Sequence, residues 1–489
     1  MKSIYEKSNP AIEKVFEKAG SRKKVMCVAF DYAKRSHTAL ACNGAAMQLR
    51  GAFDVHNTPE GLQYLDKVVR GLCRKHHIKK ECVIFGGEDC GAYAFNFIHA
   101  LAAKGSLVIG VNAKDAKDER GNVLASTDKK DPLGVAAMIL KGRGRTILPD
   151  TSDMEILRRL NRQRASLVKS RTASSNRTHH LVDQLLPGFL NKDKSGITPF
   201  SRASLWLMSE RFSAKQIHSR KLSTLVDRFR AFSVHHAEET AVQLKSLTEM
   251  ILPPPPAMIP CLQESLSHEV ITYRTLTQSI HDLEKVIARQ LASTQGAMLT
   301  TMPAMGIGLA AGLYAEMADP SRRKALYKMS SYAGLVNRLK QTGGPDKEAR
   351  SQGRSRRCNT FLKTVLIDLV IHVGLYGSPD LKSDYYRREE AGQYHRLTMA
   401  RKMLRVCAHL IEGDFYVPLE LRENPSYEAL RQYYQDAWNS ILVKWRNAGA
   451  IKQAFAKDAP LEQWRCMINE RYGLNLSNIS PQAWQLRKK

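Results

Sequence analysis

The sequence has 489 residues, and its 75 lysine and arginine residues outnumber its 47 aspartate and glutamate residues, which gives a formal net charge of +28. This length is too great for one hydrophobic core, so two or three domains are expected, and positive charge spread along the whole chain favours a nucleic-acid partner over an anionic membrane surface. Nine cysteines without a C-x-x-C pair exclude a zinc-ligand spacing and a disulfide framework.

The amino-terminal residues are polar and indicate no export signal. The opening sequence M-K-S-I-Y-E-K-S-N-P lacks the apolar core of a signal peptide, and residues 1–24 are expected to form a polar lead-in. Further along, Leu299–Ala315 carries no charge, but it is short and contains Pro303 and several glycines. It is therefore not expected to span a membrane, and a reduced cytoplasmic protein is predicted.

Short strand and helix patterns alternate over the region after the lead-in. The expected strands are Val25–Asp31, Thr38–Cys42, Met47–Val55, Val83–Gly86 and Leu107–Val111, and the expected helices are Glu60–His76, Ala92–Ala103 and one that begins near Asp131 after a polar loop. Three consecutive strands followed by alternating helix and strand is the order of a ribonuclease-H-like fold. An α/β domain is therefore predicted here.

Four acidic residues of this domain have an order suited to binding magnesium. Asp31 and Glu88 end two strands, and Asp128 and Asp131 stand three residues apart at the head of a helix. Magnesium prefers hard oxygen ligands, and two such ions stabilise both the attacking and the leaving oxygen of a phosphodiester. The alternative interpretation is that each acid is an ordinary solvated cap of a strand or helix end.

Two long helical patterns follow. Ser152–Leu186 has an apolar stripe and an opposite basic face that includes Arg162 and Arg171, and this face is either a solvated surface or a track for a phosphate backbone. Helical sequence ends at four consecutive prolines, 253–256, and no assignment is made for residues 190–260. A seam of apolar residues at alternating steps of three and four then predicts a coiled coil that pairs with the first helix or with another subunit. The seam comprises Tyr273, Leu276, Ile280, Leu283 and Ile287.

The next domain begins with T-M-P-A-M-Gly306-I-Gly308-L-A-A-G. G-x-G-x-x-A also occurs in dinucleotide-binding folds, but no β-branched strand precedes it here and no βαβ unit follows. A glycine turn leading into an apolar helix instead favours a helix-hairpin-helix-like segment, whose backbone N–H groups approach a nucleic-acid phosphate. Gly306 and Gly308 are therefore candidate nucleic-acid contacts.

The acidic motifs resemble those of the DEDD transposases, the bacterial insertion-sequence recombinases of the family numbered one hundred and ten. F-Asp31-Y-A-K-R-S-H is similar to the family's D-x-x-K strand, G-Glu88-D-C-G-A-Y to its E-x-x-G-x-Y turn, and V-N-A-K…S-T-Asp128-K-K-Asp131 to its V-N-P…K-T-D-x-x-D segment. The resemblance implies a domain similar to the junction resolvase RuvC, with these four acids as magnesium ligands. It also implies a helical coil that links two catalytic domains and mediates dimerisation.

The segment S-S-Y-A-G-L-V-N-R-L-K-Q-Thr342-G-G resembles a second motif of that family, Y-x-G-L-x-P…Q-S-G-G…K-R-G-N-x-x-L-R. The family's serine before the paired glycines attacks DNA and holds it as a covalent phosphoserine, and here Thr342 stands in its place. Cys358, Lys363 and Asn337 replace the motif's glycine, final arginine and proline.

Threonine has the same type of hydroxyl, although its extra methyl group restricts its rotamers, so Thr342 is the expected nucleophile. The alternatives are Ser351 or Ser355 in the following polar loop, or loss of the covalent step. Three arginines of that loop are expected to neutralise the scissile phosphate, or otherwise to form a solvated basic loop that grips the nucleic-acid backbone. These arginines are Arg354, Arg356 and Arg357.

The prediction is an α/β plus α protein in five segments. They are a polar lead-in (1–24), a RuvC-like DEDD catalytic domain (25–148), a helical coiled-coil region with an insertion (149–296), a mostly helical C-terminal transposase domain (297–416) and a helical extension (417–489). The extension is expected to be a small helical cap. The predicted magnesium site and the predicted hydroxyl nucleophile lie in different domains, so a composite active site is expected.

The predicted function is that of a DNA transposase or recombinase of an insertion sequence. The alternatives are a metal-dependent RuvC-like nuclease or junction resolvase without a covalent step, and a non-catalytic nucleic-acid-binding scaffold. The family resemblance implies donor and target DNA, a non-coding bridge RNA, Mg²⁺, and a homodimer or homotetramer. It also implies a bacterial cytoplasmic protein associated with the nucleoid, with no membrane partner.

Overall fold

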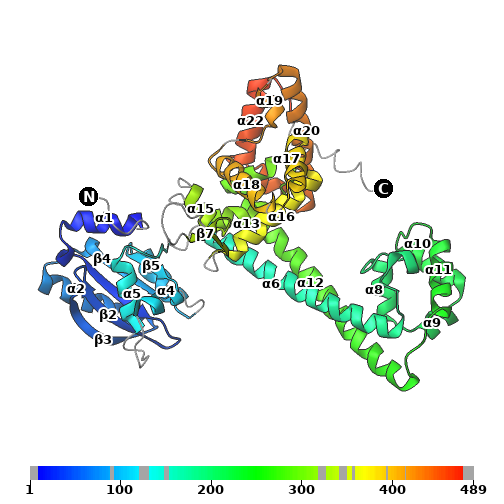
Figure 1. Cartoon of the computed structure of the whole chain (residues 1–489), viewed down its shortest axis with the longest axis horizontal. Coiled ribbons are helices and arrows are strands. Elements are labelled where there is room, and N and C mark those ends of the chain that lie inside the picture. The colour runs from blue at the N-terminus through cyan, green and yellow to red at the C-terminus, as the bar shows by residue number, and fades with distance from the viewer. Residues whose placement is uncertain are drawn as a thin grey trace. The chain divides into compact units, whose positions relative to one another are not determined.

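A computed structural model provides the structure of the chain, which divides into two compact units, Met1–Glu155 and Ile156–Lys489. Figure 1 shows both units. The structure describes residues 9–88, 93–120, 131–147, 153–317, 326–340, 350–354, 358–392, 395–413, 415–423 and 425–476.

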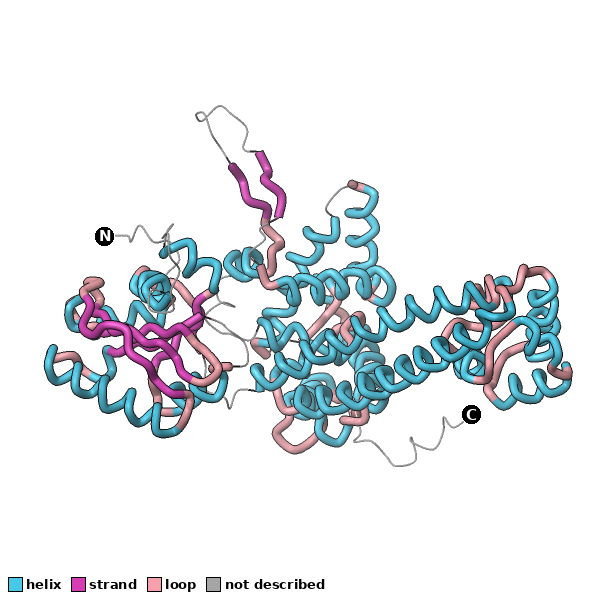
Figure 2. The backbone as a smooth tube through the Cα atoms, turned by 90° about the horizontal axis from the view of Figure 1, so that it is seen from below, coloured by secondary structure: helices cyan, strands magenta, loops and turns pink. Residues whose placement is uncertain are grey.

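A six-stranded mixed sheet forms the centre of the first unit (Figure 2). Its strands are β1 (Met26–Asp31), β2 (Ser36–Asn43), β3 (Gln48–His56), β4 (Val83–Glu88), β5 (Leu107–Val111) and β6 (Arg145–Thr146), in the order β3-β2-β1-β4-β5-β6. Strands β1, β4 and β5 are parallel, and the other pairs are antiparallel. The apolar run of β1 is buried throughout because this strand lies in the middle of the sheet.

Helices flank this sheet. They are α1 (Pro10–Ala19), α2 (Pro59–His76), α3 (Phe95–Ala103), α4 (Ala113–Arg120) and α5 (Asp131–Leu140). Helix α2 begins where Thr58 accepts a hydrogen bond from the Gly61 N–H. Helix α5 lies close over β4, since a Cβ on Gly86 would come within 2.5 Å of the Ile139 side chain.

The arrangement fits the predicted α/β ribonuclease-H-like domain, because three consecutive antiparallel strands are followed by helix-separated parallel strands on the other side of β1. The expected strands agree with the observed ones to within a few residues. One difference is the polar loop expected after β5. Residues Ala113–Arg120 form helix α4 there, although their side chains are mostly charged.

In the second unit, two long helices run side by side, α6 (Asp153–Leu185) and α12 (Ile259–Ala292), as Figures 1 and 2 show. Ion pairs join the two helices along their length, Arg164 with Glu284 and Arg177 with Glu269. The predicted pairing of the seam helix with the preceding long helix is therefore observed.

The connection between α6 and α12 forms a small helical lobe with its own core. Its helices are α7 (Lys192–Ser195), α8 (Arg202–Ser209), α9 (Ala214–Ser219), α10 (Leu222–Ala231) and α11 (Ala237–Glu249). The large buried side chains Phe189, Phe212 and Phe229 fill this core. The region for which the sequence supported no assignment is thus a folded helical insertion.

At the other end of the long helices lies a larger helical region. Its elements are a 3₁₀ helix (Gln295–Thr301), α13 (Ile307–Met317), α15 (Leu326–Tyr332), α16 (Thr360–Tyr376), α17 (Pro379–Glu390), α18 (His395–Ile411), α19 (Leu419–Glu423), α20 (Tyr427–Asn447), α21 (Ile451–Ala454) and α22 (Pro460–Tyr472). A two-stranded hairpin of β7 (Asn337–Lys340) and β8 (Arg350–Arg354) projects from it (Figure 2).

The carboxy-terminal helices share the core of this region. Buried Trp445 of α20 donates a hydrogen bond to the Thr300 hydroxyl, and Lys444 donates to the carbonyls of Thr300 and Met302. Trp484 of the predicted extension lies outside the described residues.

None of the described helices alone has the length and apolar composition needed to cross a membrane. Helices α16 and α17 meet the length and composition criteria only as a pair bent by 111°.

Candidate functional site

Two of the predicted acids lie side by side at the end of the central strands. Strands β1 and β4 are parallel with Phe30 opposite Gly87, so the next residues, Asp31 and Glu88, extend the same register. Both side chains are partly exposed, whereas the strand residues before them are buried. The sheet therefore presents two adjacent carboxylates at one edge, and the strand register determines their spacing.

Aromatic packing fixes the chain directly after Asp31. The ring of Tyr32 stacks on Phe30 with centroids 5.4 Å apart. A Cβ on Gly87 would lie 2.1 Å from the Tyr32 ring, so only glycine allows this ring to cover β4. The turn after Asp31 thus packs against the strand that ends in Glu88.

Hydrogen bonds hold the same turn from the other side. The Ala33 N–H donates to Nδ1 of buried His37, and the Asn57 side chain donates to the carbonyl of Lys34. Burial lowers the pKa of His37, although a hydrogen bond with Asn57 opposes this shift. A neutral imidazole is the form that accepts from Ala33.

Asp131 is the first residue of α5, and Asp128 lies outside the described residues. Across the part of the chain that the structure describes, no group of three or more His, Cys, Asp or Glu side chains has a metal-binding arrangement. The donor chemistry nevertheless fits magnesium, because Asp31 and Glu88 supply neighbouring carboxylate oxygens. These two residues would hold the ion together with Asp128 and Asp131.

The predicted nucleophile, Thr342, also lies outside the described residues, between β7 and β8. Ser355, Arg356 and Arg357 lie outside them as well. The expected polar loop is partly a strand, since Arg350–Arg354 forms β8 and pairs with β7.

Two of the candidates fall within that strand. The backbone of Ser351 pairs with Leu339, and that of Arg354 pairs with Asn337. Pairing of β7 with β8 thus brings together the parts of the chain that precede and follow the segment containing Thr342.

The base of the hairpin is closely packed. Gly334 has a φ of 66°, and a Cβ there would lie 2.6 Å from the Cys358 sulfur. Both conditions require glycine in the Y-A-G-L sequence before β7. The Arg401 guanidinium donates two hydrogen bonds to the Leu335 carbonyl, at 2.9 and 2.6 Å. This role of Arg401 was not predicted from the sequence.

The two glycines of the predicted helix-hairpin-helix-like segment lie at the start of α13. Gly306 accepts the hydrogen bond of the Ala310 N–H, and a Cβ on Gly306 would have no neighbour within 4 Å. A Cβ on Gly308 would approach only the Arg164 guanidinium, at 3.9 Å. Both glycines are partly exposed.

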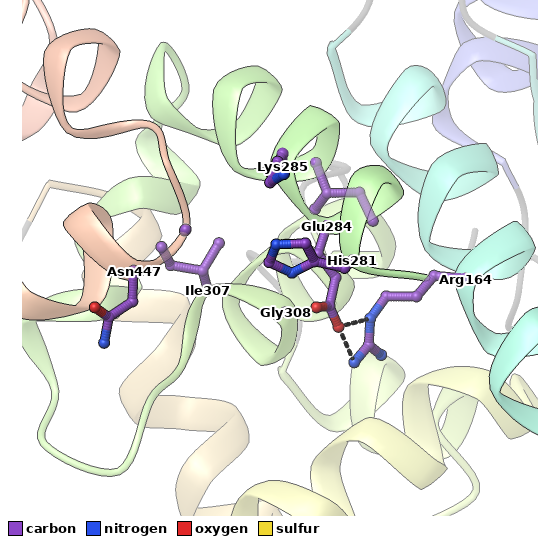
Figure 3. Close-up of a pocket in the computed structure, with 9 residues that line it drawn as sticks. Arg164, His281, Glu284, Lys285, Ile307, Gly308 and Asn447 are labelled. Carbon is purple, nitrogen blue, oxygen red and sulfur yellow. Dashed lines mark hydrogen bonds and ion pairs between the residues drawn. The ribbon is translucent and has the colours of Figure 1, made fainter. Parts of the chain in front are cut away.

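A pocket of about 200 Å³ lies beside this helix start (Figure 3). Arg164, His281, Glu284, Lys285, Ile287, Ile307, Gly308, Asn447 and Ala448 line it. Glu284 is hydrogen-bonded to the Arg164 Nε at 2.7 Å, so this carboxylate neutralises part of the positive charge there.

The two arginines predicted on the basic face of α6 differ in their exposure. Arg162 pairs with Glu316 at 3.0 Å and keeps 54% of its side-chain area exposed. Arg171 is partly buried. Glu316 was not predicted from the sequence, and its signal is a single carboxylate within the apolar run of α13.

Comparison with known protein families gives two matches. Residues 28–187 match a family model of IS110 DEDD transposases described as "Transposase", and residues 296–386 match one described as "Transposase IS116/IS110/IS902 family". Together these matches cover about half of the chain, including the strands that end in Asp31 and Glu88 and the hairpin β7–β8. No curated protein matches the sequence.

Proposed function

Because this chain belongs to the IS110 family of transposases, we propose that it cuts and rejoins DNA with a four-carboxylate magnesium site and a hydroxyl nucleophile. The observation that carries the proposal is the pair of adjacent strand-end carboxylates, Asp31 and Glu88, on the parallel strands β1 and β4. Two carboxylates at one edge of a sheet are the oxygen donors that a phosphodiester-cleaving magnesium site needs.

The four acids Asp31, Glu88, Asp128 and Asp131 would hold Mg²⁺. Bound magnesium would polarise the scissile phosphate and stabilise the developing charge on its oxygens. The acids must be ionised for this role, and the partial exposure of Asp31 and Glu88 lets DNA reach them.

The Thr342 hydroxyl would attack the phosphorus. Its oxygen forms a new bond to phosphorus while the bond to the departing sugar oxygen breaks, so the DNA becomes attached to the protein. The proton lost by the threonine is balanced by the one that the sugar oxygen takes up. Attack by a hydroxyl of another strand then reverses the step and rejoins DNA.

Basic groups of the helical region would position the DNA. The start of α13 at the partly exposed Gly306 and Gly308 can receive a phosphate through backbone N–H groups. Arg354, Arg356 and Arg357 follow the Thr342 segment in sequence and would neutralise the scissile phosphate. Arg162 and Arg171 would contribute to a backbone track along α6.

We also propose a non-coding bridge RNA, further copies of the chain in a homodimer or homotetramer, and a site of action at the bacterial nucleoid. The net charge of +28 supports more than one nucleic-acid partner.

A protein–DNA adduct that survives denaturation tests the proposal. Wild type and Thr342→Ser should form it, and Thr342→Ala should not, while the control variants Ser351→Ala and Ser355→Ala should behave as wild type. DNA cleavage by Thr342→Ala at the wild-type rate would instead favour a RuvC-like nuclease in which water attacks. Unchanged activity of Asp128→Asn would favour a non-catalytic scaffold.

A further inference from the structure

The buried carboxylate of Glu316, which pairs with Arg162, also contacts the base of the hairpin. The side chain of Glu316, in α13, has no exposed area. A buried carboxylate is stable only when it is paired and hydrogen-bonded, so its partners indicate what it organises.

Two of these partners come from the start of α6. Arg162 Nη2 lies 3.0 Å from Glu316 Oε1, and Arg158 Nε lies 3.6 Å from Oε2. Arg158 also donates a hydrogen bond to the carbonyl of Ala315, next to Glu316 in the chain. Glu316 thus joins α13 to α6 through two arginines.

The third partner comes from the base of the hairpin. The Asn359 side-chain amide donates to Glu316 Oε2 at 2.6 Å and also reaches the Tyr332 hydroxyl at 2.8 Å. The Asn359 backbone N–H donates to the Tyr332 carbonyl at 2.7 Å. Tyr332 ends α15, shortly before β7, and Asn359 follows β8, so this contact closes the base of the hairpin.

Asn359 also starts the helix that follows. Its Oδ1 accepts a hydrogen bond from the Leu362 N–H, which makes it the N-cap of α16. The amide oxygen is therefore engaged by the helix, and the amide nitrogen remains for Glu316 and Tyr332. The Asn359 side chain therefore links the start of α16, the base of the hairpin and the buried carboxylate of Glu316.

We propose that Glu316 is a positioning residue for the reaction. It holds Asn359, and through Asn359 it sets the separation of the two chain segments that lead into β7 and out of β8. This inference rests on the proposed function, because the segment between these strands contains Thr342. Attack on phosphorus needs a precisely placed hydroxyl, so a small shift of the hairpin base lowers the rate without removing any reacting group.

The test measures the single-turnover rate of adduct formation at saturating DNA, together with DNA affinity. Glu316→Gln keeps the shape of the side chain but removes its charge. We expect the rate to fall on the order of 10²-fold at a temperature at which both the variant and wild type are folded. The rate is measured at saturating DNA, so a change in affinity through Arg162 does not contribute to it. A purely structural role would lower the melting temperature and leave the rate of the folded fraction unchanged.

Two further variants serve as a probe and a control. Asn359→Ser keeps an N-cap hydroxyl for α16 but removes the amide that reaches Glu316, so it should slow the reaction in the same way. Combining both substitutions should slow it no further than the stronger single variant, because the two residues act through one link. The control is Glu269→Gln, which breaks a similar pair, Glu269 with Arg177, elsewhere on the same long helices.

A folded Glu316→Gln protein with the wild-type rate would overturn the proposal. If Glu316→Gln does not fold, Asn359→Ser decides, and a wild-type rate for that variant would overturn it equally. If wild-type protein forms no adduct, the proposed function fails and amide hydrogen exchange of β7 and β8 still tests the positioning role. Faster exchange in Glu316→Gln than in wild type would support that role, and equal exchange in the two proteins would contradict it.

Discussion

The sheet edge that carries Asp31 and Glu88 and the base of the hairpin β7–β8 are held in place by different means. At the sheet edge, backbone register and buried apolar strands set the position of the carboxylates. At the hairpin base, hydrogen bonds from Arg401 and Asn359 add to the packing of Gly334 against Cys358 and hold the chain on either side of the hairpin. The difference implies that substitutions at the sheet edge lower stability and activity together, whereas substitutions at the hairpin base lower activity with little change in stability.

The largest expected effect comes from the sheet-edge acids themselves. Asp31→Asn or Glu88→Gln should remove about 4 kcal/mol of transition-state stabilisation, on the order of 10³-fold in rate, because each weakens the magnesium site. Single-turnover cleavage of labelled DNA measures this. Asp66→Asn, which removes a partly exposed carboxylate of α2 that pairs with Arg70, serves as the control. Wild-type cleavage by Asp31→Asn would contradict the assignment.

A pair of glycines tests whether packing controls the sheet edge. Gly87→Ala places a methyl group 2.1 Å from the Tyr32 ring, so the protein should lose up to about 3 kcal/mol of stability and also lose activity. Gly71→Ala in α2 has nothing within 4 Å and should stabilise by about 0.5–1 kcal/mol. Chemical denaturation and cleavage assays measure both. A Gly87→Ala protein that is as stable and active as wild type would contradict the packing argument.

Acid pH should weaken the helical region through Asp384, which joins α17 to Lys402 of α18. Burial opposes ionisation of this group, but hydrogen bonds from Lys402, Arg387 and Arg388 prevail and lower its pKa from 3.8 to about 2. Since the folded-state pKa is the lower one, the stabilisation is complete above the unfolded pKa and is lost as the pH falls from about 4 to about 2.

Asp384→Asn should therefore lower the free energy of unfolding by about 2 kcal/mol at pH 7, and the difference from wild type should shrink below pH 4. Urea denaturation at several pH values measures this. A difference that stays constant down to pH 2 would show that the ion pairs are not its cause.

The smallest effect is expected at the hairpin base. Arg401→Lys keeps the charge but loses the paired hydrogen bonds to the Leu335 carbonyl, so adduct formation should slow about tenfold, equivalent to about 1.4 kcal/mol. DNA affinity and its salt dependence should not change. If Arg401→Gln instead reduces the salt slope of DNA binding by about one, Arg401 contacts a phosphate and does not position the hairpin.

The sequence was sufficient to predict the elements that depend on local pattern. Strand β1 is a continuous apolar run that ends in Asp31, and α2 has apolar residues at helical spacing after a threonine cap, so both have local signals. The two acids at strand ends were predictable for the same reason, because a carboxylate after a buried run marks the end of the strand.

Elements that depend on distant partners could not be predicted. Strand β8 has the polar sequence R-S-Q-G-R, and it forms by pairing with β7 and not by apolar alternation. Glu316 has partners about 40 and 154 residues away, so no local pattern indicated its contacts. The contacts of the C-terminal helices could not be predicted either, because the hydrogen-bond partner of Trp445 is Thr300, 145 residues away in the sequence.

The most direct test of the proposed mechanism is to identify the residue to which DNA becomes attached. Wild-type protein is allowed to react with donor and target DNA in Mg²⁺, denatured and digested, and the nucleotide-linked peptide is identified by mass spectrometry. The proposed mechanism predicts attachment to Thr342. Attachment to Ser351 or Ser355, or cleaved DNA with no attached peptide, would contradict it.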